Sequence, residues 1–242
     1  MTLDASQAST TENGSGTLDP AAFGLPVVAD AEIPAELHEL VAGMRRLVDV
    51  VAHTGAPPER LAHASTIVTE LADQLDMDRR EIGTMLRRDY PDASAEYGTV
   101  TNVVTGITNP AAPPLELKRH EAGEETPAGV SAAITLGGVY QGPPGLVHGG
   151  WISAMLDQAL GEAASAAGMP GLTAHLEADY PNPTPLFTPL TIRAWVTGSE
   201  RRKVFVRAEI RNGDQVTARG SAIMVQILPT LAAGGDATQR ST

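Results

Sequence analysis

The sequence predicts an α+β fold in which an antiparallel sheet wraps around one long helix, preceded by a helical extension. Two observations carry this prediction. A loop rich in glycine and proline at residues 142–150 runs into apolar residues at helical spacing. Segments with strand character lie on both sides of that helix, two before it and four after it. A sheet folded around a single helix produces this order of elements.

The N-terminal part of the chain divides by composition. Residues 1–24 have few apolar groups, so we expect a disordered tail, and we expect another at 230–242. Residues 25–90 form the helical extension: one helix after Pro34, a second after Pro57 and Pro58, and a short third one around residues 82–86. The apolar stripes are Leu37, Leu40, Val41, Met44, Leu47, Val48 and Val51, then Leu61, Ala64, Val68, Leu71 and Leu75, then Ile82, Met85 and Leu86.

Residues 91–114 are rich in Pro, Gly, Thr and Asn, which is typical of a linker, with one short element around residues 100–107. Strands are expected at residues 115–120, 130–136, 173–180, 190–198, 203–211 and 216–228. Gly213 and Asp214 predict a hairpin turn between the last two.

Gly149 and Gly150 open the central helix, although glycine weakens a helix by roughly 1 kcal/mol per residue relative to alanine. Without a Cβ they allow a ligand to approach the backbone closely. The first N–H groups of a helix have no partner within it, and they suit an oxygen that acquires negative charge. A plain junction between loop and helix, with glycines for tight packing, is the alternative.

Asp157 is the acid to explain on this helix, because small and apolar residues surround it. Nine positions separate His148 from Asp157, about 13 Å along the helix and half a turn apart in direction. One helix therefore cannot aim both residues at one small reacting group. A second copy of the chain, with its helix alongside, can place the amide end of one helix opposite the acid of the other. An ordinary exposed acid is the alternative.

These residues carry a family resemblance. Residues 142–150 read GPPGLVHGG, Asp157 follows nine positions after His148, and residues 173–186 read TAHLEADYPNPTPL. The pattern resembles the hotdog-fold acyl-CoA thioesterases of the PaaI type, especially the thioesterase-superfamily-member branch. The similarity covers about residues 95–229 and leaves the first ninety unexplained. It implies a hotdog domain at 115–229, an acyl-CoA substrate and a homodimer or homotetramer.

The resemblance also implies catalytic roles. Asp157 is the general base or nucleophile that delivers water to the thioester carbonyl, and the N–H of Gly149 holds the carbonyl oxygen. Thr173 matches a hydroxyl that orients the attacking water; a β-branched strand residue is the alternative. For His148 we favour a structural or polarising role over that of catalytic base, since the sequence offers it no acid partner.

Four residues are candidates for substrate binding. Gly150 permits close approach of the ligand, as stated above. Some relatives carry Asn or Gln six positions before the histidine, where this chain has Gly142, so that contact is absent unless Gln141 replaces it. Arg202 and Lys203 lie at a turn between strands, where they reach the phosphates of coenzyme A or form a solvated hairpin.

Composition excludes several classes. The chain has 242 residues, no cysteine and a net charge of -12, which argues against nucleic-acid binding and leaves coenzyme A dependent on a local basic patch. No segment approaches a membrane span, so we expect a cytoplasmic protein. His38, His53 and His63 lack metal-ligand spacing, and we expect neither a metal nor a cofactor.

Hydrolysis of an acyl-CoA thioester is therefore the leading hypothesis, and a non-catalytic protein that binds acyl-CoA or a partner stays open. A hotdog hydratase is disfavoured, because Asn109-Pro110 lacks the flanking acid and histidine of that signature. All candidate chemical groups lie between Gly142 and Thr173. We therefore expect the N-terminal ninety residues to dock on the sheet or across a dimer without taking part in catalysis.

Overall fold

The computed structural model describes residues 19–90, 95–123 and 127–226. The expected C-terminal tail, 230–242, and residues 1–18 of the expected N-terminal tail lie outside this part. Residues 19–24 were expected in the tail but form a capped turn, which corrects that boundary. The side chain of Asp19 accepts the N–H of Ala21 at the start of the 3-10 helix η1 (Pro20–Phe23), and Gly24 ends it in a left-handed conformation.

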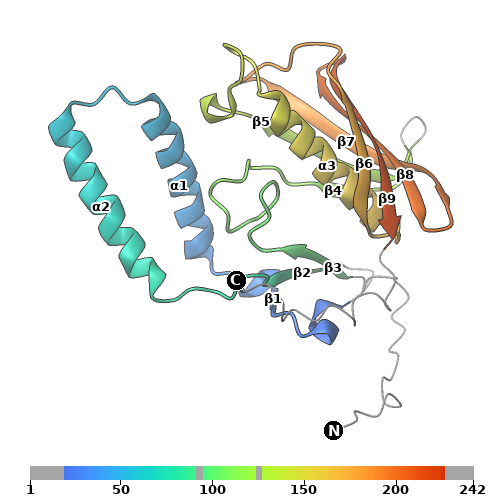
Figure 1. Cartoon of the computed structure of the whole chain (residues 1–242), viewed down its shortest axis with the longest axis horizontal. Coiled ribbons are helices and arrows are strands. Elements are labelled where there is room, and N and C mark those ends of the chain that lie inside the picture. Colours follow the sequence, from blue (N-terminus) through green and yellow to red (C-terminus); the bar gives the residue numbers. More distant parts are fainter. Residues whose placement is uncertain (1–18, 91–94, 124–126, 227–242) are drawn as a thin grey trace, which may run out of the picture.

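A six-stranded antiparallel sheet wraps around the helix α3 (Gly149–Ala166), as the sequence predicts (Figure 1). Its strand order is β4-β5-β7-β8-β9-β6. The strands are β4 (Lys118–His120), β5 (Gly129–Thr135), β6 (Gly171–Asp179), β7 (Pro189–Glu200), β8 (Lys203–Asn212) and β9 (Gln215–Gln226). β4 is shorter than expected, because Leu115 leaves the strand pattern and packs into the core.

α3 is buried along its length because its apolar residues meet the inner face of the sheet. Ile152, Met155, Leu156, Ala159, Leu160, Ala163 and Ala164 are all buried. A Cβ at Gly220 on β9 would lie 3.3 Å from side-chain atoms of Leu156 and Leu160, so glycine lets strand and helix approach closely. This packing fixes α3 as the rigid support of the candidate site.

The strand β6 contains a bulge that changes the direction of one side chain. Thr173 pairs with Met224, and the next pair is His175 with Ile223, so Ala174 is an extra residue. Leu176, further along β6, packs against the core. Strict alternation would therefore turn Thr173 away from α3, and the bulge returns it to the helix side.

The N-terminal region contains a helical hairpin and a small sheet. The helices are α1 (Ala35–His53) and α2 (Pro58–Asp76), which confirms the first two expected helices. The small sheet has the order β1-β2-β3, with β1 (Val27–Ala29), β2 (Met85–Asp89) and β3 (Ala95–Thr99); a 3-10 turn, η2 (Asp30–Glu32), follows β1. Another 3-10 turn, η3 (Gly138–Tyr140), precedes the loop that leads to α3.

Two expectations for this region are wrong. The third helix, around residues 82–86, is replaced by β2, because a stretch this short is a marginal helix while its backbone pairs with both β1 and β3. The linker at 91–114 contains β3, and its residues 100–107 form turns. The side chain of Asn102 holds these turns by accepting the N–H groups of Val104 and Thr105, at 2.7 and 2.9 Å.

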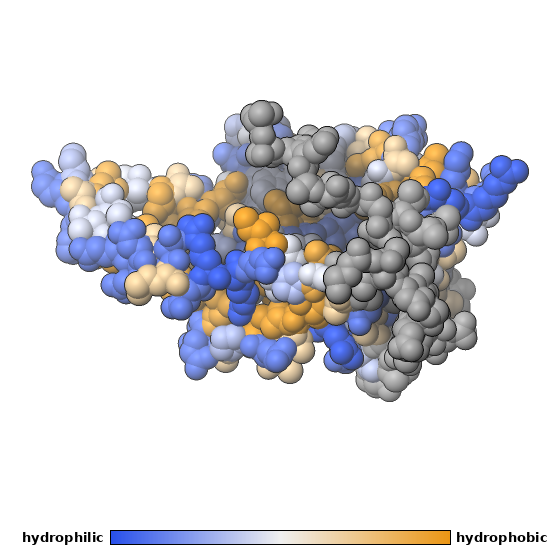
Figure 2. All heavy atoms as spheres, turned by 60° about the horizontal axis from the view of Figure 1, so that its bottom comes forward, coloured by the Kyte–Doolittle hydropathy of each residue, from blue (hydrophilic) through white to orange (hydrophobic). Residues whose placement is uncertain are grey.

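The hairpin stands beside the sheet (Figure 1), and many of its apolar side chains are exposed. α1 is anchored through Val41, which is buried, and Arg45, which donates to the carbonyls of Ala112 and Asn109. α2 has no buried residue. Exposed hydrophobic side chains on the two helices include Val48, Val50, Val51, Leu61, Ile67, Val68 and Leu75. Figure 2 shows hydrophobic side chains among hydrophilic ones in this part of the surface, at its left. Within the described residues, no helix is long and apolar enough to cross a membrane.

Candidate active site

The N-terminal end of α3 presents a backbone donor. His148 is the N-cap, and its Nδ1 accepts the N–H of Gly150 at 2.9 Å. The backbone oxygen of His148 accepts the N–H of Trp151. Within the described residues, the N–H of Gly149 has no hydrogen-bond acceptor. It lies at the positive end of the helix dipole, where an oxyanion is stabilised.

The contacts of His148 agree with a structural role. Its Nδ1 accepts the N–H of Gly150, so this ring nitrogen is occupied in capping the helix. A Cβ at Gly142 would lie 2.8 Å from the Cα of His148, so glycine is required here for the loop to fold against the cap. The side-chain oxygen of Gln141 accepts the N–H of Gly145 within the same loop.

Tyr180 and Ser153 join this end of the helix, and the sequence analysis assigned a role to neither. The Tyr180 hydroxyl lies 2.5 Å from the Ser153 hydroxyl and donates to the carbonyl of Gly149 at 3.2 Å. A Cβ at Gly149 would lie 3.8 Å from the tyrosine ring. Tyr180 follows directly after β6 and lies inside the TAHLEADYPNPTPL segment, but its contact with α3 depends on the packing of that strand end.

Asp157 lies in the middle of α3 and pairs with Thr173. The Thr173 hydroxyl donates to Oδ1 of Asp157 at 2.8 Å, and it also lies 3.5 Å from the sulfur of Met224, its cross-strand partner. Asp157 is half-buried. One carboxylate oxygen is thus held by Thr173, and the other is available to a water molecule.

A cavity of about 400 Å³ opens beside this pair, and the N-terminal region forms one of its walls. Met85, Tyr97 and Thr99 line it from β2 and β3, opposite Asp157 and Thr173. The sequence analysis expects the candidate chemical groups between residues 142 and 173, and the cavity beside Asp157 is also lined by residues outside that range. No sequence signal marks this wall, because β2 and β3 reach α3 only through the tertiary fold.

The wall is held against the main sheet by a cluster of three polar residues. The Tyr90 hydroxyl donates to Oε2 of Glu96 at 2.5 Å, and Oε1 of Glu96 lies 3.4 Å from the guanidinium of Arg119. That guanidinium also lies over the Tyr90 ring, 4.5 Å from its centroid. Burial, with the bond to Glu96, raises the pKa of Tyr90 to about 12.

A second chain of polar groups links the wall to α3 next to Asp157. The amide of Asn102 donates to Gln158, and the amide of Gln158 donates to Glu162, each at 3.0 Å. Burial raises the pKa of Glu162, and the hydrogen bond from Gln158 opposes that rise. The pattern of apolar residues on α3 gave no indication of this buried acid.

The N–H of Gly149 and the carboxyl of Asp157 lie far apart within one chain. Gly149 and Asp157 are separated by about 12 Å of helix, and Gly149 does not line the cavity beside Asp157. The structure brings together Asp157 and Thr173 at one position and His148, Gly149 and Gly150 at another.

Comparison with known proteins places this geometry in a family. A crystal structure of a thioesterase superfamily protein aligns with a TM-score of 0.69 and 31% sequence identity, covering 83% of this chain and 100% of that one. The chain belongs to the thioesterase superfamily. The family's sequence pattern matches residues 144–219, which contain both ends of the candidate site. The alignment covers 83% of this chain, whereas residues 115–229 make up less than half of it. The alignment therefore also includes part of the N-terminal region of this thioesterase superfamily member.

Curated relatives match a shorter segment. The acyl-coenzyme A thioesterase THEM4 of Xenopus laevis is 36% identical over 95 residues, which are 38% of this chain and 43% of the relative. THEM4 of Bos taurus is 38% identical over 87 residues, 36% of this chain and 35% of the relative. The matched part of this superfamily member therefore spans less than half the length of these relatives.

Arg202 and Lys203 lie outside the cavity beside Asp157. The guanidinium of Arg202 donates twice to the backbone oxygen of Gln226, at 3.3 and 2.9 Å, and Gln226 pairs with Gly171 at the start of β6. Gly171 lines the cavity, so the turn with Arg202 stands at the cavity's rim.

Proposed function

We propose that the protein hydrolyses an acyl-CoA thioester to the free acid and coenzyme A. The hydrogen bond of 2.8 Å between Thr173 and Asp157 carries this proposal, because it fixes an acid beside a cavity with one oxygen left for water. The acyl-coenzyme A thioesterase activity of the THEM4 relatives and membership of the thioesterase superfamily support it.

In the proposed reaction, Asp157 accepts a proton from water as the water oxygen adds to the thioester carbonyl. The N–H of Gly149 donates to the oxyanion of the tetrahedral intermediate, and the helix dipole strengthens that interaction. The carbon–sulfur bond then breaks and coenzyme A leaves as a thiolate, which takes up a proton. Thr173 holds Asp157 in orientation, and His148 keeps the helix end capped.

The site is completed by a second copy of the chain. About 12 Å separates Gly149 from Asp157 on one helix, so two antiparallel copies of α3 bring the donor of one chain to the acid of the other. β6 lies at the edge of the sheet, and its residue Leu172 is 67% exposed beside Thr173. An open edge strand next to the catalytic pair is suited to cover by a second copy.

Arg202 and Lys203 are proposed to meet the coenzyme A phosphates at the rim of the cavity. The backbone of Gly150 and the side chain of Gln141 are proposed to contact the substrate near its thioester group. Since the chain carries a net charge of -12, these cations are needed locally to offset repulsion of the anionic ligand.

The first test is turnover by the full chain. Purified protein is incubated with acetyl-, hexanoyl-, 6-hydroxyhexanoyl- and palmitoyl-CoA, and the released thiol is followed with a thiol-reactive dye. We expect release well above the chemical background with at least one substrate. Tight binding of every ligand with no release would replace this proposal by the non-catalytic binding protein.

The shared site is tested by mixing two inactive variants. Gly149→Pro removes the donor N–H at the first helical position, where proline is well tolerated, and Asp157→Ala removes the acid. Each variant alone should be inactive. After subunit exchange, half of the dimers are mixed and one of their two sites is intact, so about a quarter of the activity should return. Absence of recovery after verified exchange would place both groups of a site within one chain.

A further inference from the structure

The cavity beside Asp157 has polar walls. Apart from a few residues such as Met85, Leu172 and Met224, its lining is dominated by groups that form hydrogen bonds. These include Thr99, Asn102, Thr105, Gln158, Glu162 and Ser165. A long alkyl chain offers these groups no further partner, and each group that it leaves unsatisfied costs about 1 to 3 kcal/mol.

Glu162 is an acid of this lining on the same helix as Asp157. It stands five residues beyond Asp157, about 7.5 Å further along the axis of α3. Gln158 donates to its Oε1, and Thr105 lies close enough to its carboxyl to influence its pKa through a hydrogen bond. A carboxyl group has about four acceptor sites, so these two neighbours leave room for a further partner.

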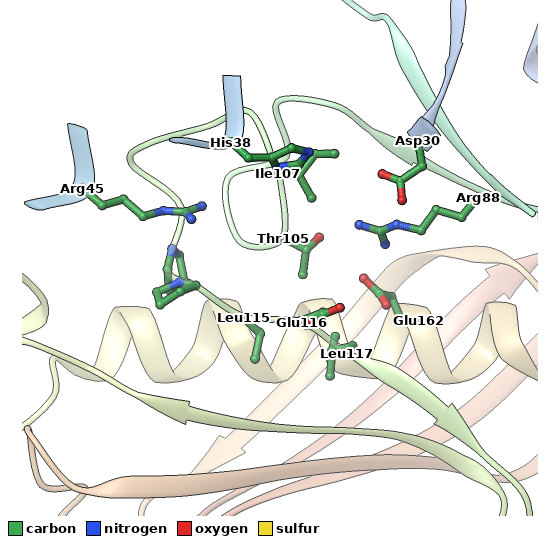
Figure 3. Close-up of a pocket in the computed structure, with 13 residues that line it drawn as sticks. Asp30, His38, Arg45, Arg88, Thr105, Ile107, Leu115, Glu116, Leu117 and Glu162 are labelled. Atoms are coloured by element: carbon green, nitrogen blue, oxygen red, sulfur yellow. The ribbon is translucent and has the colours of Figure 1, made fainter. Parts of the chain in front are cut away.

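Glu162 also marks the passage to a second cavity, of about 370 Å³ (Figure 3). Arg88, Thr105 and Glu162 line both cavities. In Figure 3 the side chain of Arg88, from β2, points toward Glu162 on α3. The far end of the Asp157 cavity is therefore a polar junction between α3 and the N-terminal sheet.

We propose that this cavity binds the acyl group, and that the preferred acyl group is short and ends in a hydroxyl that pairs with Glu162. Five helix positions separate Asp157 from Glu162 by about 7.5 Å along the axis and about 140° around it, so the acyl chain must span at least six bonds of about 1.25 Å each. A hydroxyl both donates and accepts, so it pairs with the carboxyl in either protonation state. This assignment rests on the proposed thioester hydrolysis and adds its substrate class.

The N-terminal sheet acquires a function in this assignment. β2 and β3 supply the wall that faces α3, and the chain from Asn102 through Gln158 to Glu162 fixes the receiving carboxyl. Without that wall the cavity would open to solvent, and water would compete for Glu162.

Two substrates of equal length provide the test. kcat/KM of the full chain is measured for hexanoyl-CoA and 6-hydroxyhexanoyl-CoA, and we expect about a tenfold preference for the hydroxylated substrate. Binding is measured in parallel by calorimetry with the non-hydrolysable thioethers hexyl-CoA and 6-hydroxyhexyl-CoA. Equal kcat/KM values, or a preference for hexanoyl-CoA, would overturn the assignment.

Variants at Glu162 connect the preference to this side chain. Glu162→Gln keeps a hydrogen-bonding group of the same size and should retain most of the preference. Glu162→Leu removes it and should reduce the ratio of the two kcat/KM values by about tenfold. Glu70→Leu, at an exposed position of α2 outside both cavities, is the matched control and should leave the ratio unchanged.

The outcomes separate this assignment from the proposed reaction. If no acyl-CoA is hydrolysed but 6-hydroxyhexyl-CoA binds about tenfold more tightly than hexyl-CoA, the reaction is wrong and the acyl site stands. If hydrolysis occurs but neither the preference nor its loss in Glu162→Leu is seen, the reaction stands and the acyl site is wrong. If Glu162→Leu does not fold, the thioether comparison on Glu162→Gln and the unmodified chain decides.

Discussion

The two positions on α3 that carry the proposed chemistry are built in different ways. The helix end at Gly149 is made from one continuous stretch, in which the loop from Gly142, the His148 cap and the first turn follow one another. Asp157, in the middle of the helix, is surrounded by residues from β2, β3 and β6, which are distant in sequence.

This difference indicates which part of the site can accept substitutions. The helix end depends mainly on the local backbone of one loop and one helical turn, with Tyr180 and Thr184 as its contacts from more distant segments. The surroundings of Asp157 depend on a strand bulge and on the docking of the N-terminal sheet. Substitutions in β2 and β3 can therefore change the surroundings of Asp157 without any change in the loop and first turn at the helix end.

The largest expected effect is at Asp157. Asp157→Ala should lower kcat by about a thousandfold, because it removes the acid that Thr173 holds beside the cavity to accept the proton from water. Asp157→Asn tests charge at constant volume and should be equally inactive. Asp73→Ala, at an exposed position of α2, serves as the control in the same thiol-release assay. Full activity of Asp157→Ala would remove the mechanism.

Thr173 should show an intermediate effect. Thr173→Val replaces the hydroxyl by a methyl group of similar size, so Asp157 loses its hydrogen bond and kcat should fall about tenfold. Thr173→Ser restores the hydroxyl and should recover most of the rate. Equal rates in the valine and serine variants would show that Thr173 acts only as a strand residue.

Removing the Tyr180 hydroxyl tests how much the reaction depends on the support of the helix end. Tyr180→Phe removes the hydroxyl that contacts Ser153 and the carbonyl of Gly149, which leaves the packing of the ring in place. We expect a loss of about threefold in kcat, because the helix end is held less firmly while its N–H donor persists. A loss as large as that of Asp157→Ala would instead give the Tyr180 hydroxyl a direct part in the reaction.

Substitution of His148 should have the smallest effect on rate of these variants, but a measurable effect on stability. His148→Ala removes the N-cap of α3 and should lower the free energy of unfolding by about 1 kcal/mol in urea titration. His148→Asn supplies another capping acceptor and should recover most of that loss. His175→Ala, whose side chain forms only an exposed pair with Glu177, should change stability little. If His148→Ala lost activity with unchanged stability, the residue would be a catalytic base.

Sequence alone determined the features that depend on neighbouring residues. The period of the apolar positions predicted α3, the two helices of the hairpin and all six strands of the main sheet, because burial on one face imposes its period on the sequence. The glycines and the spacing of His148 and Asp157 predicted a helix-end donor far from the acid on one chain. The sequence leaves the role of Thr173 open: it matches either a hydroxyl that orients the attacking water or an ordinary β-branched strand residue.

Only the tertiary structure decided what stands beside Asp157. A short helix around residues 82–86 and a linker from residue 91 were expected, but Met85–Asp89 and Ala95–Thr99 form strands because backbone pairing with a neighbour outweighs weak local preference. The bulge at Ala174 turns Thr173 toward α3, against the alternation that a strand pattern implies. In the sequence, Glu162 is one acid among alanines. Its position in the cavity lining results from the docking of β2 and β3 on α3. Contacts between segments distant in the chain leave no period in the sequence, so they had to be seen in the fold.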